Sequence, residues 1–124
     1  MLMQNPDNLR VSAEAEKLAN AIYDYTRRFP REEIFGLVAQ MRKAAVSVGS
    51  NIFEACGRQG NRENESNASA RSFYYHSHGS ATELVFQLRI ARHQRMGDPA
   101  QAKAIEKQLD LVRRQLRRLI IRLP

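Results

Sequence analysis

The sequence predicts an all-α protein, an antiparallel four-helix bundle whose successive helices run up, down, up and down. Apolar residues recur at alternating spacings of four and three in four segments of the 124-residue chain, and no segment shows the alternation of a β-strand. Mostly short stretches rich in proline, glycine and asparagine join these segments, and short connections favour antiparallel neighbours. We therefore expect one domain over residues 10–124, after a disordered or frayed N-terminus at residues 1–9.

The first helix follows this polar N-terminus. Its apolar face consists of Val11, Ala15, Leu18, Ile22, Tyr25 and Phe29. The helix is expected to end near Phe29, because the residue before a proline is pushed out of the helical region and Pro30 comes next.

The second helix is predicted from residue 30 to about residue 57. Pro30 suits the first helical position, where its missing N–H costs nothing, and Glu32 and Glu33 complement the positive end of the helix dipole. Its apolar face is expected to contain Ile34, Val38, Met41, Ala45, Val48, Ile52 and Ala55. The following segment, residues 57–67, is rich in glycine, asparagine and charge and is predicted to be a loop.

The third and fourth helices are predicted over residues 68–95 and 99–122. One face of the third consists of Phe73, Ser77, Ser80, Leu84, Leu88 and Ala91. The small side chains in its first half imply that another helix approaches closely. Between the two helices, Gly97, Asp98 and Pro99 suit a C-terminal cap, an N-cap and a first helical position. The apolar face of the fourth helix contains Ile105, Leu109, Val112, Leu116, Leu119, Ile120 and Leu123.

Positive charge is concentrated in the fourth helix. The chain carries a formal charge of +7 with a pI near 10.2, which favours polyanionic partners. Seven basic residues lie in this helix: Lys103, Lys107, Arg113, Arg114, Arg117, Arg118 and Arg122. Two interpretations stay open. The residues form a phosphate-binding surface for RNA or another nucleic acid, or they form a solvated surface that complements the C-terminal half of the helix dipole.

Two helices carry apolar residues outside the face that the bundle needs. They are Phe35, Val46 and Phe53 on the second helix and Tyr75, Val85 and Phe86 on the third. Scattered apolar residues are common on protein surfaces. Contiguous apolar patches on a small protein, however, usually mark a contact surface. We favour a subunit interface and expect the chain to bind copies of itself.

Other classes of site are not supported. Cys56 is the single cysteine, which rules out an intramolecular disulfide or a Cys-based zinc site, and we expect a small buried side chain. His76 and His78 point about 200° apart on a helix and cannot bind one ion. We predict no metal and no cofactor. The N-terminus lacks the apolar core of a signal peptide and no apolar run is long enough to span a membrane, so we expect a cytoplasmic protein without a membrane partner.

Two local patterns have a functional and an ordinary interpretation. Arg71 and His76 have the Arg-x4-His spacing of some helical endoribonucleases. Such a short pattern arises easily by chance in an arginine-rich chain, so an endoribonuclease is a remote alternative and we predict no enzymatic activity. Asn51 lies near the apolar face of the second helix and needs hydrogen-bond partners. It either bonds to Ser47 or the following loop, or binds a ligand together with Glu54 and Arg58.

Several motifs in order resemble a known family. In the second helix they are Phe29-Pro30, Glu33, Gly36-Leu37, Gln40, Arg42, Ala45, Ser47, Ser50-Asn51-Ile52, Glu54 and Gly57-Arg58. Later residues are Gly79-Ser80, Glu83-Leu84, Ile90-Ala91 and Leu119-Ile120. Over residues 15–122 the chain resembles the bacterial four-helix-bundle family of ribosomal RNA intervening-sequence proteins. It departs from the family pattern at Gly49, where proline is usual, and at Phe53, where a small residue is usual.

The resemblance implies a ring-like homo-oligomer, a homopentamer, without known enzymatic activity. The superfamily includes the accessory variability determinant of retroelements, which binds reverse transcriptase and nucleic acid through basic surface. We therefore expect a non-enzymatic oligomeric bundle that binds RNA, another nucleic acid or a nucleic-acid enzyme through basic helix faces. The alternative is a purely structural or protein-interaction module with no nucleic-acid role.

Overall fold

The computed structural model describes residues 9–58 and 63–123, and every regular element in these ranges is helical. The four α-helices are α1 (Arg10–Thr26), α2 (Ala39–Arg58), α3 (Glu63–His93) and α4 (Pro99–Arg122). A short 3-10 turn, η2 (Arg31–Glu33), and a π-helical turn, η3 (Ile34–Val38), precede α2. The predicted all-α class with four packed helices is confirmed.

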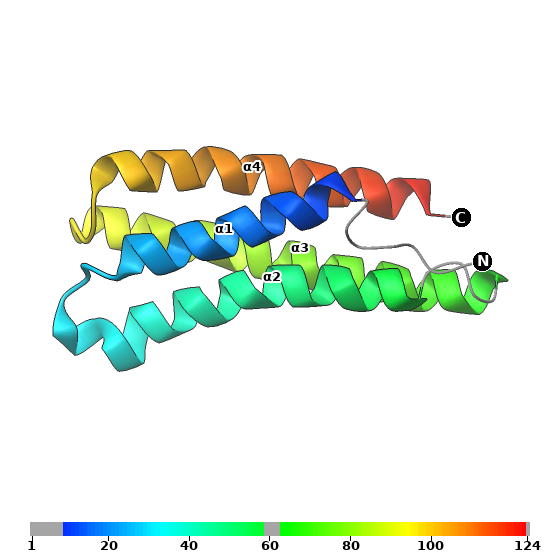
Figure 1. Cartoon of the computed structure of the whole chain (residues 1–124), viewed down its shortest axis with the longest axis horizontal. Helices are drawn as coiled ribbons and strands as arrows, with labels where there is room; N and C mark the ends of the chain where they lie inside the picture. Colours follow the sequence, from blue (N-terminus) through cyan, green and yellow to red (C-terminus); the bar gives the residue numbers. More distant parts are fainter. Residues whose placement is uncertain (1–8, 59–62, 124) are drawn as a thin grey trace.

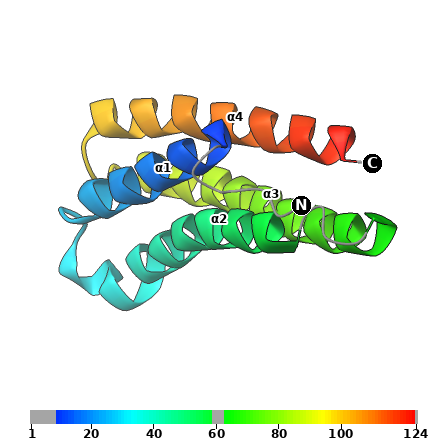
Figure 2. The same ribbon diagram turned by 45° about the vertical axis from the view of Figure 1, so that its right-hand side comes forward.

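Each helix packs against two neighbours. Helix α1 packs against α2 and α4, and α3 packs against the same two helices (Figures 1 and 2). The α1–α2 and α3–α4 connections lie together at the left end of Figure 1, whereas α4 ends at the right. At the left end the Tyr25 hydroxyl donates to the Met96 carbonyl oxygen over 2.9 Å and joins the two connections.

The core lies along the common axis of the four helices. Its largest fully buried side chains are Leu18, Ile22, Tyr25, Met41, Val48, Ile52, Tyr74, Leu84, Ile105, Leu109, Val112 and Leu116. Full burial of a leucine or isoleucine side chain contributes about 1.5–3 kcal/mol, so this set dominates the stability of the bundle. The predicted faces of the first and fourth helices are buried, except that Leu119 is only partly covered. On α3 the sequence pattern missed Tyr74, which is buried beside a half-buried Phe73.

The predicted start of the second helix is wrong. Pro30 precedes the 3-10 turn with an extended backbone, and α2 begins only at Ala39. The π-helical turn between them contains Gly36, whose φ of −106° and ψ of −112° are not helical. An extra residue in a π-turn rotates the preceding side chains relative to the rest of the helix. Ile34 therefore leaves the predicted apolar face and is 48% exposed.

The predicted loop and N-terminus also need correction. Gly57 belongs to α2, and α3 begins at Glu63, so every described residue of 57–67 is helical. The rest of the predicted loop, residues 59–62, lies outside the described residues. The N-terminus was predicted to be frayed over residues 1–9. Leu9, however, is half-buried and packs on the core. Residues 1–8 lie outside the described part.

The turn between α3 and α4 starts two residues earlier than predicted. Helix α3 ends at His93 and Arg95 adopts a left-handed φ of 59°, while the Met96 N–H donates to the Ala91 carbonyl oxygen over 2.9 Å. Gly97 is also left-handed, with φ of 73°. Asp98 is the N-cap of α4, as predicted, and its carboxylate accepts the Gln101 N–H over 3.1 Å.

Small polar side chains join α2 and α3. The buried Ser77 hydroxyl donates to the Val48 carbonyl oxygen over 2.7 Å, and the Ser80 hydroxyl donates to the Ser47 hydroxyl oxygen over 3.0 Å. Such short side chains reach the neighbouring helix only when the two backbones approach closely. The close approach predicted from Ser77 and Ser80 is therefore confirmed.

Candidate nucleic-acid interface

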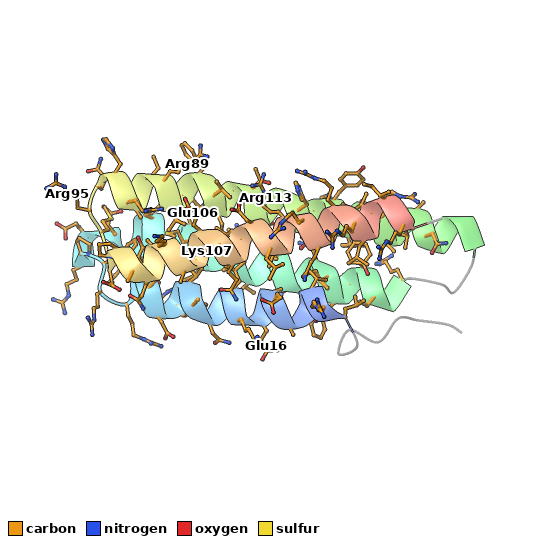
Figure 3. The ribbon with its side chains drawn as sticks, turned by 90° about the horizontal axis from the view of Figure 1, so that it is seen from above. Glu16, Arg89, Arg95, Glu106, Lys107 and Arg113 are labelled. Carbon is orange, nitrogen blue, oxygen red and sulfur yellow. The ribbon has the colours of Figure 1, made fainter. Side chains whose placement is uncertain are left out.

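The seven basic residues of α4 face away from the core. Six of them are exposed and Arg113 is half-buried. Among the described residues, no salt bridge joins any of the seven to a carboxylate. Figure 3 looks onto α4 and shows Lys107 on its outer side and Arg113 beside α3. The predicted concentration of basic side chains on the outer part of one helix is thus present in the folded chain.

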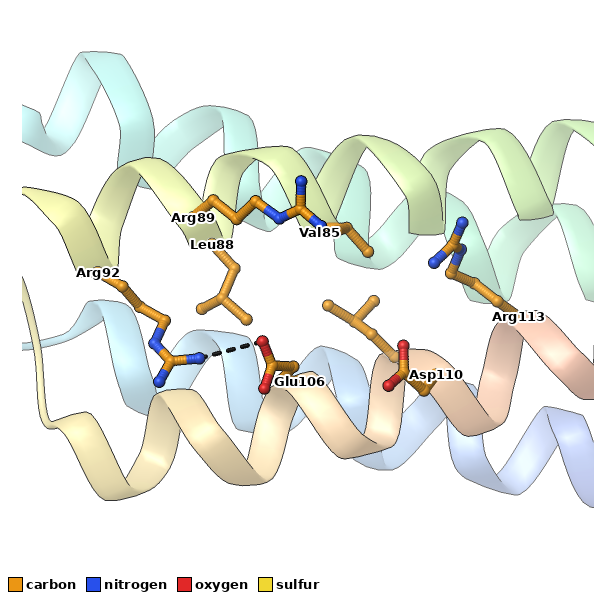
Figure 4. A pocket seen from close by; sticks show the side chains of 8 residues that line it. Val85, Leu88, Arg89, Arg92, Glu106, Asp110 and Arg113 are labelled. Atoms are coloured by element: carbon orange, nitrogen blue, oxygen red, sulfur yellow. Dashed lines mark hydrogen bonds and ion pairs between the residues drawn. The ribbon is translucent and has the colours of Figure 1, made fainter.

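The basic surface continues onto α3 along one edge of α4. A pocket of about 180 Å³ lies between the two helices, and its lining includes Arg89, Arg92 and Arg113 with Glu106 and Asp110 (Figure 4). Arg92 pairs with Glu106, with Nη1 and Oε2 3.1 Å apart. Three cations face two carboxylates, which leaves the pocket with an excess positive charge.

On the other edge of α4 the basic surface reaches the start of α1. Arg118 and Arg122 line a pocket of about 190 Å³ together with Arg10. The sequence analysis missed Arg10 and Arg89, because residues so distant in the chain become neighbours of α4 only through the packing of the helices. In the sequence, Arg10 and Arg89 could be recognised only as charged residues on the solvent-facing side of a helix.

His78 lies on α3 within the field of this basic surface. Burial lowers the pKa of its imidazole, and the positive charges of Arg113 and Arg117 lower this pKa further. The His78 Nε2 and Arg113 Nε atoms are buried without a hydrogen-bond partner among the described residues. The imidazole therefore stays neutral to a lower pH than a free histidine does, and its protonation would add a third positive charge at this place.

The Arg-x4-His pair does not form a common site. Five residues along a helix correspond to about 140° of rotation, so Arg71 and His76 point to different sides of α3. Arg71 Nη2 donates to the Leu123 carbonyl oxygen over 2.7 Å, whereas the exposed His76 ring contacts the edge of Phe73. Within residues 9–58 and 63–123, no three His, Cys, Asp or Glu side chains cluster in a way that suits a metal ion.

The motif residues near the end of α2 bind one another and α3. Asn51 Nδ2 donates to the Ser47 carbonyl oxygen over 2.9 Å, which is the ordinary role considered for this amide. Arg58 pairs with Glu54 and its guanidinium lies 4.8 Å from the centre of the Phe73 ring.

The other motif residues lie apart from this group, some buried and some exposed. Phe29 is buried against Tyr25, with ring centres 4.9 Å apart, and Pro30 and Glu83 are exposed. A Cβ at Gly79 would meet no atom within 4 Å, so this glycine lies on an open surface. The thiol of Cys56 is buried, as predicted, and burial raises its pKa.

The six residues predicted for a subunit interface do not form one patch. Val46 and Phe53 line a groove between α1 and α2, and Tyr75 and Phe86 lie on the exposed side of α3. Phe35 is 95% exposed on the π-helical turn. Val85 is half-buried in the pocket between α3 and α4, so it is less available for a partner than the other five.

One comparison with known proteins finds a family that matches most of the chain. The sequence model of a protein family described as 23S rRNA-intervening sequence protein matches residues 7–118. This range contains α1, α2 and α3 completely and α4 up to Arg118. No curated protein matches the chain. No helix among the described residues is long and apolar enough to cross a lipid bilayer.

Proposed function

Because the chain belongs to the 23S rRNA-intervening sequence protein family, we propose that it binds RNA, or an enzyme that acts on nucleic acid, through the basic surface of α4. The observation that carries this proposal is the set of seven basic side chains on α4, six of them exposed, none of which forms a salt bridge with a described residue. Phosphate groups neutralise such charges and release bound counterions, which is the main source of non-specific nucleic-acid affinity.

The proposal includes the assembly and the cellular setting. The four helices form an antiparallel, up-down-up-down bundle, and copies of the bundle assemble into a ring-like homo-oligomer, a pentamer by resemblance to the family. Exposed apolar side chains such as Phe53 and Phe86 support self-association. In a ring, α4 of each copy contributes to a repeated basic surface that meets RNA in the cytoplasm.

The protein acts in this proposal without catalysing a reaction. The separation of Arg71 from His76 on α3 counts against the endoribonuclease alternative. The second candidate is a purely structural or protein-interaction module, for which the positive charge serves only solubility. Exposed lysine and arginine side chains at the C-terminal half of a helix are compatible with that role too.

Salt dependence of RNA binding separates the two candidates. A single-stranded RNA is titrated with the protein at several salt concentrations, and log K is plotted against log[salt]. Binding through phosphate contacts gives a steep negative slope. Affinity that does not change with ionic strength, or no measurable binding at low salt, would refute RNA binding through the basic surface and favour a module that binds proteins.

A charge reversal tests whether α4 carries the binding. The double variant Arg114→Glu/Arg118→Glu is expected to weaken binding for all sequences and to flatten the salt slope by about 1.4, which is about 0.7 for each lost phosphate contact on single strands. The control variant Arg31→Glu/Lys43→Glu reverses two exposed charges outside α4. Each double variant changes the formal charge by −4, from +7 to +3, so equal losses in both would mean that only the net charge matters.

A further inference from the structure

We propose that an unpaired RNA base stacks on the ring of Tyr75, on α3 beside the C-terminal end of α4, while arginines of α4 hold the adjoining phosphates. This inference rests on the proposed function and specifies its ligand, a single-stranded segment of RNA. It concerns one surface of the chain, which we call the aromatic-basic patch and define as Tyr75, Arg117, Arg118 and Ile121.

Tyr75 lies where α3 runs beside the last turns of α4. Four residues before it, Arg71 Nη2 donates to the Leu123 carbonyl oxygen over 2.7 Å. Three residues after it, His78 lies within the field of the Arg117 guanidinium. Residues three and four apart on a helix share one side of it. Tyr75 is therefore on the same side of α3 as two residues that contact or approach the end of α4, and it lies between them.

Ile121 is the second apolar member of the patch. It belongs to the last turn of α4 and is 76% exposed, and Tyr75 is 58% exposed. Arg117 and Arg118 precede Ile121 by four and three residues, so they lie about one turn away, on either side of it. Both arginines are exposed. The solvent-facing apolar side chains at this place are therefore surrounded by the basic surface of α4.

Acidic residues are distant from the patch along both helices. On α3 the nearest one to Tyr75 is Glu83, about 12 Å away along the helix axis at 1.5 Å per residue. On α4 the nearest one to Arg117 is Asp110, about 10 Å away on the same scale. The local charge is thus positive. It favours a polyanion at this place over a second copy of the chain, which itself carries a formal charge of +7.

An exposed aromatic ring within a basic surface suits single-stranded nucleic acid. Basic side chains follow the phosphate backbone of a single strand, and its bases stack on aromatic rings. The bases of a duplex stay paired and stacked on one another, so an A-form RNA helix offers a protein its phosphates and 2′-hydroxyl groups instead. The patch therefore predicts that the protein prefers single-stranded to double-stranded RNA.

Two variants at one position separate stacking from charge. Tyr75→Ala removes the ring, and its affinity for a short unstructured RNA is expected to fall at least about fivefold, as the loss of one stacking contact predicts. The slope of log K against log[salt] should stay that of the parent, because no phosphate contact is lost. Tyr75→Phe keeps a ring and should bind like the parent. A blunt RNA duplex of the same length should bind Tyr75→Ala and the parent equally.

A third variant reports stacking directly. The chain contains no tryptophan, so Tyr75→Trp places a single indole in the patch. Saturation with the single-stranded RNA is expected to quench the indole emission, because a base stacked on the ring deactivates its excited state. Heparin is a polyanion without bases. It should compete for the arginines but leave the emission nearly unchanged.

Each other outcome has a definite meaning. A Tyr75→Ala protein that binds single-stranded RNA like the parent overturns the stacking site and leaves RNA binding through α4 intact. Indole emission that RNA does not change, or that heparin quenches as strongly, overturns the site as well. The same holds if Tyr75→Ala weakens duplex binding as much as single-strand binding. A parent protein that binds no RNA refutes the proposed function itself, which distinguishes that failure from an error in the stacking site.

Controls exclude trivial explanations. Phe35→Ala removes an aromatic ring that is 95% exposed and lies outside α3 and α4, and this variant is expected to bind RNA like the parent. Because Tyr75 was also predicted for a subunit interface, sedimentation velocity compares the mass of Tyr75→Ala with that of the parent. A lower mass would assign Tyr75 to that interface and overturn the stacking site. If circular dichroism shows that Tyr75→Ala is not folded, the comparison of RNA with heparin on Tyr75→Trp decides alone.

Discussion

Replacement of Gly97 by alanine should destabilise the bundle strongly, because two independent effects act at this position. The backbone of Gly97 has φ of 73°, a left-handed conformation that costs a residue with a Cβ about 1–2 kcal/mol. A Cβ there would also lie 2.5 Å from Tyr25 Cε1 and 2.8 Å from Phe29 Cε1. These rings are buried in an edge-to-face contact and the Tyr25 hydroxyl is bonded to the Met96 carbonyl, so neither ring has space to retreat.

Overpacking of a filled core typically costs about 1–3 kcal/mol. The two effects together predict a loss of about 3 kcal/mol in the free energy of unfolding, measured by urea denaturation at equal protein concentration. Gly57→Ala is the matched control, because a Cβ at this helical position meets no atom within 4 Å and stability should stay equal or rise by up to about 1 kcal/mol. A loss below about 0.5 kcal/mol in Gly97→Ala would refute the steric argument.

Three further perturbations test other parts of the structure. The pKa of His78 is lower in the folded chain than in the unfolded chain, where it is about 6.5. Between these two pKa values the unfolded chain therefore binds more protons than the folded chain does. The melting temperature should therefore fall over this range, and His78→Gln should reduce the fall; an identical pH profile in the variant would contradict this. Ser77→Ala removes the hydrogen bond to the Val48 carbonyl and should cost about 1 kcal/mol in urea unfolding, whereas an unchanged midpoint would show that this bond is dispensable. The Cys56 thiol, buried and with a raised pKa, should react with a thiol reagent only as fast as the bundle opens, so rapid labelling of the native protein at pH 8 would contradict its burial.

The sequence predicted a helix correctly where clear start signals and a regular apolar spacing occurred together. Helix α4 begins and ends as predicted, because Asp98 and Pro99 give unambiguous start signals and the apolar face is regular. The start of α2 could not be predicted in the same way. Ile34 and Val38 have helical spacing in the sequence, but the π-helical turn at Gly36 shifts one of them to the surface. Such a turn depends on packing at the end of the bundle and leaves no periodic signal.

In the candidate site, too, the sequence predicted what depends on one helix and missed what depends on the packing of several helices. The exposure of residues such as Arg114 and Arg118 followed from helical periodicity alone, since they lie opposite the apolar face. Their neighbours from other helices, Arg10 and Arg89, required the packing of α1 and α3 beside α4. The division of the apolar surface residues between the groove of α1 and α2 and the exposed side of α3 also required the fold, because sequence spacing fixes directions only within one helix.

The close packing of α2 and α3 has a consequence for the proposed ring. In a closed ring the rotation from one copy to the next is a full turn divided by the copy number, about 72° for five. In a head-to-tail ring, the outward directions of the two contact surfaces on one chain differ by 180° minus this rotation, which is about 108° for five copies. The hydrogen bonds from Ser77 and Ser80 hold α3 in its position against α2. In the proposed ring, a bulkier side chain at Ser80 that tilts α3 against α2 would change the angle between surfaces on these two helices and, with it, the number of copies.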